Sequence, residues 1–119
     1  MQFQLLNGAI EVTDATGRLV WRGKPLQHRV KSVIPLAGED ICIVLLDPDV
    51  QLRSHFENVV CVDPHGGVVW RASLPTSGND DCYLALAYEG GALVANSWSG
   101  FRVRIDPRGG RILDAVFTK

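Results

Sequence analysis

The sequence lacks long apolar runs, a strong net charge and paired cysteine motifs, and each absence excludes a class of protein. Its longest apolar run, Ile41–Leu46, is far shorter than the roughly 20 residues that a transmembrane helix needs. The formal net charge is only −1, which gives no electrostatic basis for binding nucleic acid or an anionic membrane. The first residues contain neither a basic nor a long apolar segment, so we expect no signal peptide and predict a cytoplasmic protein.

The sequence also lacks a recognisable catalytic or metal-binding motif. Its three cysteines, Cys42, Cys61 and Cys82, form no C-x-x-C pair, and no histidine stands at a matching offset. We therefore expect buried, reduced thiols rather than metal ligands. There is no G-x-S-x-G segment, no P-loop and no H-E-x-x-H segment. The sequence thus predicts no catalytic residue, no metal and no cofactor, and it favours a protein that is not an enzyme.

What the sequence has is a two-residue alternation of apolar and polar side chains, typical of half-buried β-strands, whereas helical periodicity is hard to find. Turn formers separate the alternating segments, and Asn7 with Gly8 favours a two-residue hairpin because both residues tolerate positive φ. Short strands at this spacing predict an all-β, antiparallel fold. The predicted strands are Gln2–Leu6, Ala9–Thr13, Leu19–Arg22, Arg29–Pro35, Ile41–Leu46, Asn58–Val62, Val68–Ala72, Tyr83–Tyr88, Ala92–Asn96, Phe101–Ile105 and Arg111–Phe117.

Three segments of the chain repeat one phrase: VTDATGRLVW, VDPHGGVVW and RIDPRGGRIL. In each, an Asp is followed three residues later by a Gly and seven residues later by a large apolar residue. We expect the carboxylate to accept hydrogen bonds from the turn, the Gly to supply a positive φ, and the large residue to fill the space between neighbouring sheets. The aligned residues are Asp14, Gly17 and Trp21; Asp63, Gly66 and Trp70; and Asp106, Gly109 and Leu113.

This phrase resembles the repeat of quinoprotein-like β-propellers, whose outer hairpin reads Asp, then Thr-Gly, then a short strand that ends in Trp. The resemblance implies about three propeller-like blades of three to four strands in one domain of residues 1–119, with units at about 1–27, 28–75 and 76–119. The first unit has one predicted strand fewer than the others. The best-known enzymes of the family carry pyrroloquinoline quinone with calcium. The adjacent cysteines that lie under that quinone are absent from this chain, so we expect no cofactor.

Three blades do not close an ordinary propeller, which has about four to eight. Three arrangements stay open at this point. Two chains could join into a six-bladed homodimeric ring, the sheets could fold on one another as a compact sandwich or irregular barrel, or a different protein could complete the arc. An unclosed arc would expose sheet faces and strand edges, and such edges tend to associate.

Two segments concentrate side chains that could bind a partner. The first is the long connection LDPDVQLRSHFEN, in which Arg53, His55 and Glu57 would form a binding loop. Asp47 and Asp49 stand in the same connection. A calcium site needs about six to eight oxygen ligands, and the turn glycine of a calcium loop is missing, so we predict no metal there.

The second segment is the turn ANSWSGFRVRI, in which Trp98 lies outside the alternating register. Turn tryptophans are often partly exposed and often belong to binding faces. Four neighbours would surround the indole with hydrogen-bonding groups: Asn96, Ser97, Ser99 and Arg102. A third polar segment, TSGNDDCY, is interpreted as a linker between blades rather than a catalytic pair, because consecutive acidic residues usually point in different directions.

These observations favour a non-enzymatic β-repeat module that binds a protein partner, for example an inhibitor or an immunity-type protein that neutralises one target. Small size, near-neutral charge and the lack of a visible catalytic constellation motivate this hypothesis. One alternative is a small-ligand-binding or enzymatic propeller whose central pocket forms in a homodimer. Another is a structural subunit that completes the ring of a different protein.

Overall fold

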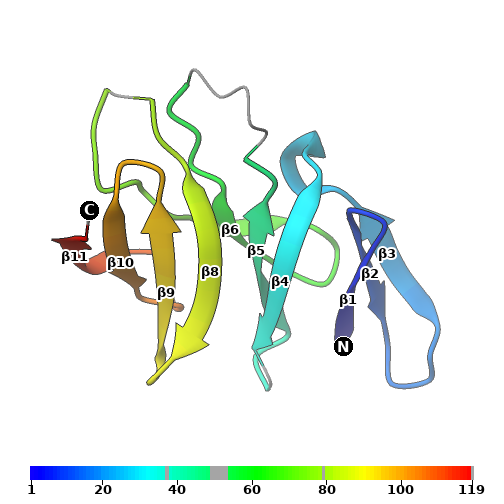
Figure 1. The fold of residues 1–119 in the computed structure, drawn as a ribbon. Helices are drawn as coiled ribbons and strands as arrows, with labels where there is room; N and C mark the ends of the chain where they lie inside the picture. The colour runs from blue at the N-terminus through cyan, green and yellow to red at the C-terminus, as the bar shows by residue number, and fades with distance from the viewer. Residues whose placement is uncertain (37, 49–53, 79, 119) are drawn as a thin grey trace.

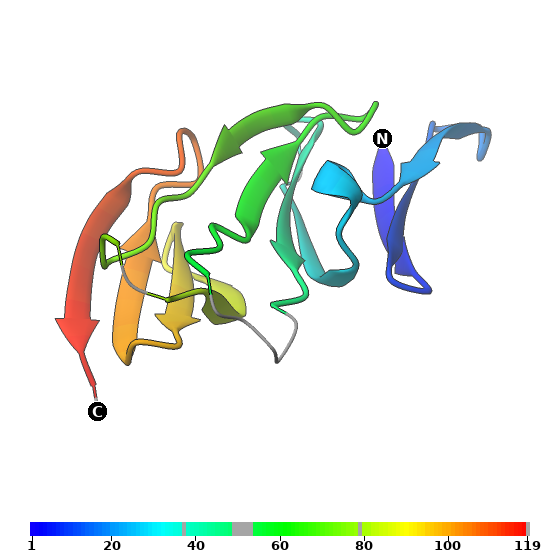
Figure 2. The same ribbon diagram turned by 90° about the horizontal axis from the view of Figure 1, so that it is seen from above.

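The fold comes from a computed structural model that describes residues 1–36, 38–48, 54–78 and 80–118. It confirms the predicted all-β, antiparallel class, because the described residues form antiparallel sheets of three, four and four strands. The sheets stand side by side (Figure 1) and, seen from above, follow an arc (Figure 2). This is the partial propeller that the repeat implies. No helix in the described ranges has the length and apolarity of a membrane-crossing helix.

The first sheet, blade 1, consists of β1 (Gln2–Leu6), β2 (Ala9–Thr13) and β3 (Leu19–Gly23), in the order β1-β2-β3. Asn7 and Gly8 form the turn between β1 and β2 with φ values of 53° and 75°, which is the positive-φ pair that the sequence predicts. A short 3-10 helix, η1 (Pro25–Gln27), leads from blade 1 to the next sheet.

The other two sheets have four strands each. Blade 2 consists of β4 (Val30–Leu36), β5 (Ile41–Leu46), β6 (Val59–Val62) and β7 (Val68–Arg71), paired in chain order. Blade 3 consists of β8 (Tyr83–Glu89), β9 (Ala92–Ser97), β10 (Phe101–Ile105) and β11 (Ile112–Phe117), also paired in chain order. All the predicted strands are present, and their boundaries differ from the predicted ones by no more than one residue at either end.

Blade 1 lacks the strand that would occupy the first position of the sheet. Its last strand, β3, carries Trp21 as β7 carries Trp70, so β1 corresponds to β5 and the described residues of blade 1 contain no counterpart of β4. The N–H of Val30, at the start of β4, donates to the carbonyl of Gly8 at 2.8 Å, and β4 lies beside β1. The predicted shortage of one strand in the first unit is therefore confirmed.

The middle blade is buried on both faces, which explains its unbroken apolar sequence. On β5, Ile43 and Leu45 pack in the core that blade 2 shares with blade 3. Cys42, Val44 and Leu46, which alternate with them, pack in the core shared with blade 1. A strand that is buried on both faces needs no polar alternation. The two hydrophobic cores therefore lie between successive blades.

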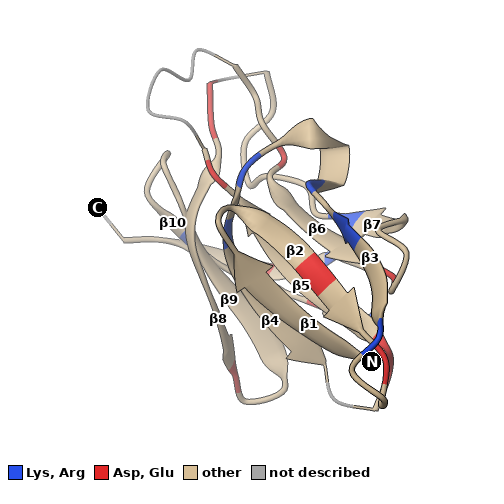
Figure 3. Ribbon diagram, turned by 90° about the vertical axis from the view of Figure 1, so that its right-hand side faces the viewer, with Lys and Arg blue, Asp and Glu red and all other residues tan. Residues whose placement is uncertain are grey.

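The outer faces of blades 1 and 3, which we call the end faces, carry charged pairs. On blade 1, Glu11 alternates with the fully buried Ile10 and Val12, so its side chain lies on the opposite face of the sheet. Its carboxylate accepts a hydrogen bond from Arg22 on β3, with an Nη2–Oε2 distance of 2.6 Å. Figure 3 looks onto this end face, with charged positions on both β2 and β3.

Blade 3 repeats this arrangement on its own outer face. Arg102 and Arg104 alternate with the fully buried Val103, which packs toward blade 2. Arg102 pairs with Glu89 at 3.1 Å, and Arg104 pairs with Asp114 at 2.7 Å. Each pair joins strands of the same sheet, so the charges on both end faces are satisfied within a single blade.

The first two corners of the repeat have the geometry that the sequence predicts. Asp14 accepts hydrogen bonds from the backbone N–H groups two and four residues further on, at 2.9 and 3.0 Å. Asp63 accepts the equivalent pair at 2.8 and 3.0 Å. Gly17 and Gly66 have φ values of +84° and +80°, which residues with a Cβ adopt only at a cost.

The third corner is one residue longer, so the prediction for Gly109 is wrong. The positive φ of +77° belongs to Gly110 instead. The N–H of Gly110 donates to the carbonyl of Asp106, four residues back, whereas Gly66 donates to the carbonyl of Asp63, three residues back. The role of Asp106 is unchanged, because its carboxylate still accepts a backbone N–H of the turn at 3.0 Å.

The extra residue also overturns the alignment of Leu113 with the two tryptophans. Trp21 and Trp70 follow an irregularity in their strand and stand opposite the neighbouring strand of the same sheet. On β11 the residue at this place is Asp114, opposite Arg104. Leu113 falls within the irregularity and is 44% exposed, so it does not fill a space between sheets.

Each tryptophan of the repeat packs on the corner of the next blade. The ring of Trp21 lies so close to Gly66 that a Cβ at this glycine would overlap it, and the ring of Trp70 lies in the same way on Gly110. The Nε1–H of Trp70 also donates to the carbonyl of Pro107 at 3.1 Å. These two tryptophans therefore fill the space between successive sheets, as the repeat predicts.

Candidate functional site at the loop end

Two segments that are far apart in the sequence meet along one edge of the sheets, at the top of Figure 1. The described part of the long connection before β6 and the turn between β9 and β10 are both bonded to Asp81, which lies two residues before β8 begins at Tyr83. We call this surface the loop end and define it by residues 54–57, 76–78, 80–82 and 97–100.

Asp81 holds the loop end together from inside. It is only 1% exposed. One carboxylate oxygen accepts the N–H groups of Cys82 and Ser99, at 2.9 and 3.0 Å, and the other accepts the hydroxyls of Thr76 and Ser99, at 2.6 and 2.8 Å. A buried carboxylate is costly unless hydrogen bonds of this kind satisfy it. These four bonds join the linker between blades to the turn between β9 and β10.

The backbone of Asp81 fixes the long connection to the same point. The N–H of Phe56 donates to the carbonyl of Asp81 at 2.9 Å, and the N–H of Asp81 donates to the carbonyl of Ser54 at 3.2 Å. His55, between these two bonds, forms an isolated parallel bridge with Asp81 and is exposed. The ring of Phe56 packs against that of His28 in a tilted arrangement, with centroids 4.7 Å apart. The connection is thus attached to blade 3 next to the predicted binding residue His55.

The turn between β9 and β10 presents Trp98 on a fixed backbone. The N–H of Trp98 donates to the carbonyl of Cys82 at 2.8 Å, and the N–H of Gly100 closes the turn onto the carbonyl of Ser97 at 3.0 Å. The hydroxyl of Ser97 accepts the N–H of Phe101 at 3.1 Å. Trp98 itself is 57% exposed. A large part of the indole therefore faces solvent from a well-bonded turn.

The four neighbours predicted to surround Trp98 divide between two places. The hydroxyls of Ser97 and Ser99 bond to each other at 2.8 Å, and that of Ser99 also bonds to Asp81, so both serve the interior of the loop end. Asn96 and Arg102 stand opposite each other on β9 and β10, on the end face of blade 3 that carries the Arg102–Glu89 pair. These two residues are therefore not part of the loop end.

Glu57 has a structural contact at its backbone. Its carbonyl accepts a hydrogen bond from Nε of Arg71 at 2.7 Å, and the residue is half-buried. Arg53 and Asp49 of the long connection, and Asn79 of the linker, lie outside the described residues. In the part of the chain that the structure describes, no three His, Cys, Asp or Glu side chains gather as they would around a metal ion.

Two further buried residues position the loop end, and the repeat pattern predicts neither of them. The amide of Asn58 donates to the carbonyls of Leu46 and Tyr83, at 2.9 and 2.8 Å, and its oxygen accepts the N–H of Tyr83 at 2.7 Å. The hydroxyl of Tyr83 donates to the carbonyl of Ser73 at 2.6 Å, and burial raises the pKa of this phenol above its ordinary value. The sequence signal for Asn58 is its place before the apolar run VVCV; Tyr83 gives none.

The cysteines are buried and unpaired by disulfides, as predicted. Burial raises the pKa of Cys42 to about 12 and that of Cys61 to about 11, because the thiolate loses its hydration in the core. Burial also raises the pKa of Cys82, which lies next to the loop end. These groups are protonated near neutral pH, so none has the thiolate character of a reactive cysteine.

Comparisons with known proteins agree with this fold. A family model described as a domain of unknown function (DUF7957) matches residues 22–117. The chain is similar to the crystal structure of BamB from Moraxella catarrhalis, with a TM-score of 0.60 and 13% sequence identity over 99% of this chain and 35% of that chain. A search of curated proteins finds no match.

Two computationally designed proteins are also similar in structure. The match to Ika8 has a TM-score of 0.58 and 18% identity over 98% of this chain and 33% of that chain. The match to Ika4 has a TM-score of 0.60 and 20% identity over 95% of this chain and 63% of that chain. This chain therefore spans about a third of BamB and Ika8 and less than two thirds of Ika4. At these identities the likeness shows the fold alone.

Proposed function

The chain belongs to the family of the domain of unknown function DUF7957, and from this premise we propose that it is a non-enzymatic β-repeat interaction module that binds a protein partner. The observation that carries the proposal is Trp98, an exposed aromatic residue on a turn that the buried Asp81 fixes. Aromatic residues are over-represented among those that dominate binding energies at protein interfaces, and loops on a rigid scaffold are common binding surfaces.

The loop end combines an apolar anchor with polar surroundings. Trp98 offers the area of an indole, and the exposed Ser54 and His55 belong to the same surface. Interfaces typically have such an aromatic centre with a polar rim. Because hydrogen bonds already order the backbone beneath Trp98, binding loses little conformational entropy there. The partner that fits this surface is a folded protein with a pocket that admits an indole.

The charged pairs on the end faces support an open arc over a two-chain ring. Val60 and Val62 of blade 2 pack toward the preceding blade. The equivalent residues of blade 1 are Glu11 and Thr13, which lie on its outer face. Covering the Glu11–Arg22 pair with another sheet would remove its hydration, which is costly for charged groups. Repeat proteins commonly have polar outer faces on their terminal repeats. We propose that the module acts as a monomer and binds its partner through the loop end.

An inhibitor or immunity-type protein that neutralises a single target is the concrete form of this proposal. A near-neutral module with one anchored aromatic residue fits selective binding of one protein better than electrostatic attraction to many partners. We propose a cytoplasmic location, which its three free cysteines support because thiols stay reduced in that compartment. The Asp, Gly and Trp of the first two corners support a repeat of the quinoprotein-like type.

Affinity capture from the native host, with three forms of the purified chain, tests the proposal. The wild type should retain a protein partner in stoichiometric amount. Trp98→Ala should bind this partner at least about thirtyfold more weakly, because interface hot spots contribute about 2 kcal/mol or more. Val69→Ala is the control, because it removes an apolar side chain of similar exposure, 53% against 57%, on β7 outside the loop end. It should leave the affinity unchanged.

Two results would count against the proposal, and they differ in meaning. If the wild type retains no protein above background, the proposed function is wrong. If Trp98→Ala retains the partner with wild-type affinity, the assignment of the loop end as the binding surface is wrong. Circular dichroism of each variant shows whether a loss of binding comes from unfolding.

A further inference from the structure

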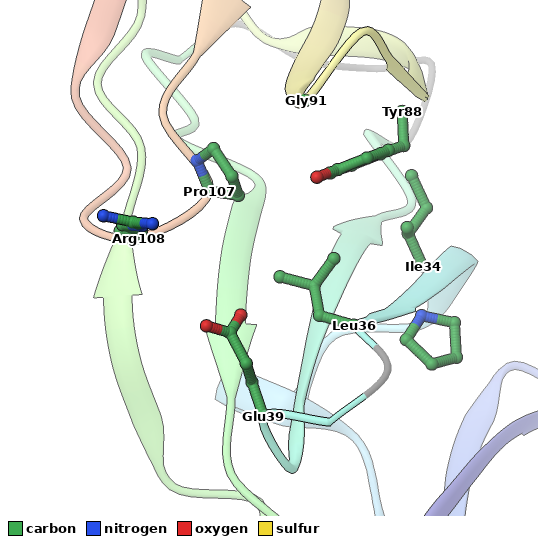
Figure 4. Close-up of a pocket in the computed structure, with 8 residues that line it drawn as sticks. Ile34, Leu36, Glu39, Tyr88, Gly91, Pro107 and Arg108 are labelled. Atoms are coloured by element: carbon green, nitrogen blue, oxygen red, sulfur yellow. The ribbon is translucent and has the colours of Figure 1, made fainter.

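The edge of the sheets opposite to the loop end contains a cavity of about 620 Å³ between blades 2 and 3. Its walls come from the end of β4 and the turn after it, the end of β8, and the turn between β10 and β11 (Figure 4). Small-molecule sites in proteins typically have volumes of about 300–1,000 Å³. The lining residues that matter here are Ile34, Leu36, Glu39, Tyr88, Pro107 and Arg108.

One part of the cavity is apolar. Ile34 and Leu36 are partly buried and pack against the core between blades 2 and 3. In Figure 4 their side chains lie side by side below the ring of Tyr88, whose hydroxyl points toward Pro107. An apolar group that entered here would contact aliphatic carbon on one side and an aromatic ring on the other.

The other part of the cavity carries two opposite charges. Glu39 and Arg108 come from different turns, and in Figure 4 both lie on the side of the cavity away from Ile34. Among the described residues, neither side chain takes part in a hydrogen bond or an ion pair. Both residues are exposed, so the edge of the cavity offers one acceptor group and one donor group that other described residues do not engage.

The backbone that carries these charges is fixed by neighbouring residues. The N–H of Arg108 donates to the carboxylate of Asp106 at 3.0 Å. The preceding residue, Pro107, accepts the Nε1–H of Trp70 at 3.1 Å. On the other wall, the N–H of Glu39 donates to the carbonyl of Leu36 at 3.3 Å. The bond from Trp70 thus anchors the turn that carries Arg108 to blade 2 before any ligand binds.

We propose that this cavity binds a small amphipathic zwitterion, namely a free α-amino acid or a short peptide with a large apolar side chain. The ammonium group binds the carboxylate of Glu39, and the carboxylate group binds the guanidinium of Arg108. The apolar side chain lies on Ile34 and Leu36 beneath Tyr88. This site is separate from the loop end, so it can be tested independently of the proposed function.

A titration followed by ¹H–¹⁵N correlation spectra of the full chain tests the proposal with L-phenylalanine and the dipeptide leucyl-phenylalanine as probes. Both should shift the amide signals of the β4–β5 and β10–β11 turns at millimolar concentration and leave those of the loop end unchanged. Phenylalaninamide, which lacks the carboxylate, and N-acetylphenylalanine, which lacks the ammonium group, should each bind about tenfold more weakly than phenylalanine. Tighter binding of phenylalanine would identify the ligand as a free amino acid, and tighter binding of the dipeptide would identify it as a short peptide.

Matched variants assign each charge to its residue. Arg108→Gln should weaken the binding of phenylalanine about tenfold but leave that of phenylalaninamide unchanged, because the amide has no carboxylate to lose. Glu39→Gln should weaken the binding of phenylalanine about tenfold and leave that of N-acetylphenylalanine unchanged, because the acetylated ligand has no ammonium group. Arg104→Gln, the same substitution on the end face of blade 3, should change neither. The spectra also show that each variant is folded. No shift at these turns with either zwitterion, or wild-type affinity in Arg108→Gln, would overturn the proposal.

Discussion

At the scale of single residues, two buried polar side chains connect segments that are distant in the sequence. Asp81 joins the long connection, the linker and the turn between β9 and β10 through hydrogen bonds of its side chain and backbone. Asn58 joins β5 to β8 through three hydrogen bonds. Losing either side chain would leave buried donors or acceptors without a partner, which costs more than the bond itself contributes. The shape of the loop end therefore depends on these two residues.

Asp81→Asn should lower the free energy of unfolding by about 1–3 kcal/mol, because the amide nitrogen cannot accept the hydrogen bonds that a carboxylate oxygen accepts. Asp80→Asn is the matched control, because Asp80 is exposed. Surface substitutions of this kind usually change stability by no more than about 0.5 kcal/mol. Urea denaturation of the two variants measures the difference. Equal midpoints for both would show that Asp81 does not hold the loop end.

The corner at Asp14 makes a prediction about pH. The hydroxyl of Thr16, with further help from the backbone N–H groups of Arg18 and Thr16, lowers the pKa of Asp14 below its ordinary value. A lowered pKa means that the fold favours the ionised form, so this contribution is present above the ordinary pKa and is lost as the pH falls through the lowered one. Thr16→Val should raise the pKa of Asp14 toward its ordinary value.

An NMR titration of the Asp14 carboxyl carbon measures this shift. Thr16→Ser is the control, because it retains the hydroxyl and should retain the low pKa. If Thr16→Val and the wild type titrate alike, the side chain of Thr16 does not stabilise the carboxylate.

The residues of the loop end show what a sequence can and cannot reveal at this scale. Trp98 is recognisable because it interrupts an alternating pattern within a Ser and Gly turn, and it is indeed exposed. The function of Asp81 leaves no such signal, because it depends on contacts with Ser99, 18 residues away, and with the backbone of Phe56. The same contacts turn the hydroxyls of Ser97 and Ser99 inward, whereas the sequence predicts that they surround the indole.

At the scale of elements, the corners connect one blade to the next. In two of the three corners a glycine lies under the ring of a tryptophan from the preceding blade, whereas the glycine of the first corner has no atom within 4 Å of the place a Cβ would take. All three glycines have a positive φ. The three corners thus separate the cost of backbone strain from the cost of disturbing the contact between blades.

Three alanine variants measure these two costs. Gly17→Ala should lower the free energy of unfolding by about 1 kcal/mol, because it introduces backbone strain alone. Gly66→Ala and Gly110→Ala should cost about 1–3 kcal/mol more, since their Cβ would also displace Trp21 or Trp70. Thermal or urea denaturation measures all three. Similar losses for the three variants would contradict the contact between each tryptophan and the next corner.

The elements themselves are largely predictable, because alternation and turn residues are local features. Ile41–Leu46 is predicted as a strand although it does not alternate, and its burial on both faces explains the unbroken run. The third corner is predicted incorrectly because Gly109 and Gly110 are adjacent. The repeat pattern alone selects the first of them, while the hydrogen bonds of a turn with one more residue select the second.

At the scale of the whole molecule, the arc has apolar faces inside, whereas its two end faces carry charged pairs beside exposed apolar residues such as Leu6 and Val116. Blade 2 is covered on both sides, and its strands consist almost wholly of apolar residues. The end faces carry the pairs Glu11–Arg22, Arg102–Glu89 and Arg104–Asp114, each satisfied within its own sheet. Asp114 also occupies the place where the other blades have the tryptophan that contacts the next corner. We therefore expect the arc to remain open and to leave the loop end accessible.

Sedimentation equilibrium at micromolar concentration tests this claim most directly, because it reports the mass of the assembly without assuming its shape. An open arc with charged pairs on its end faces should give a single species near 13.0 kDa, with no increase as the protein concentration rises. A species of twice that mass at the same concentration would mean that two chains associate, and the inference from the end faces would be wrong.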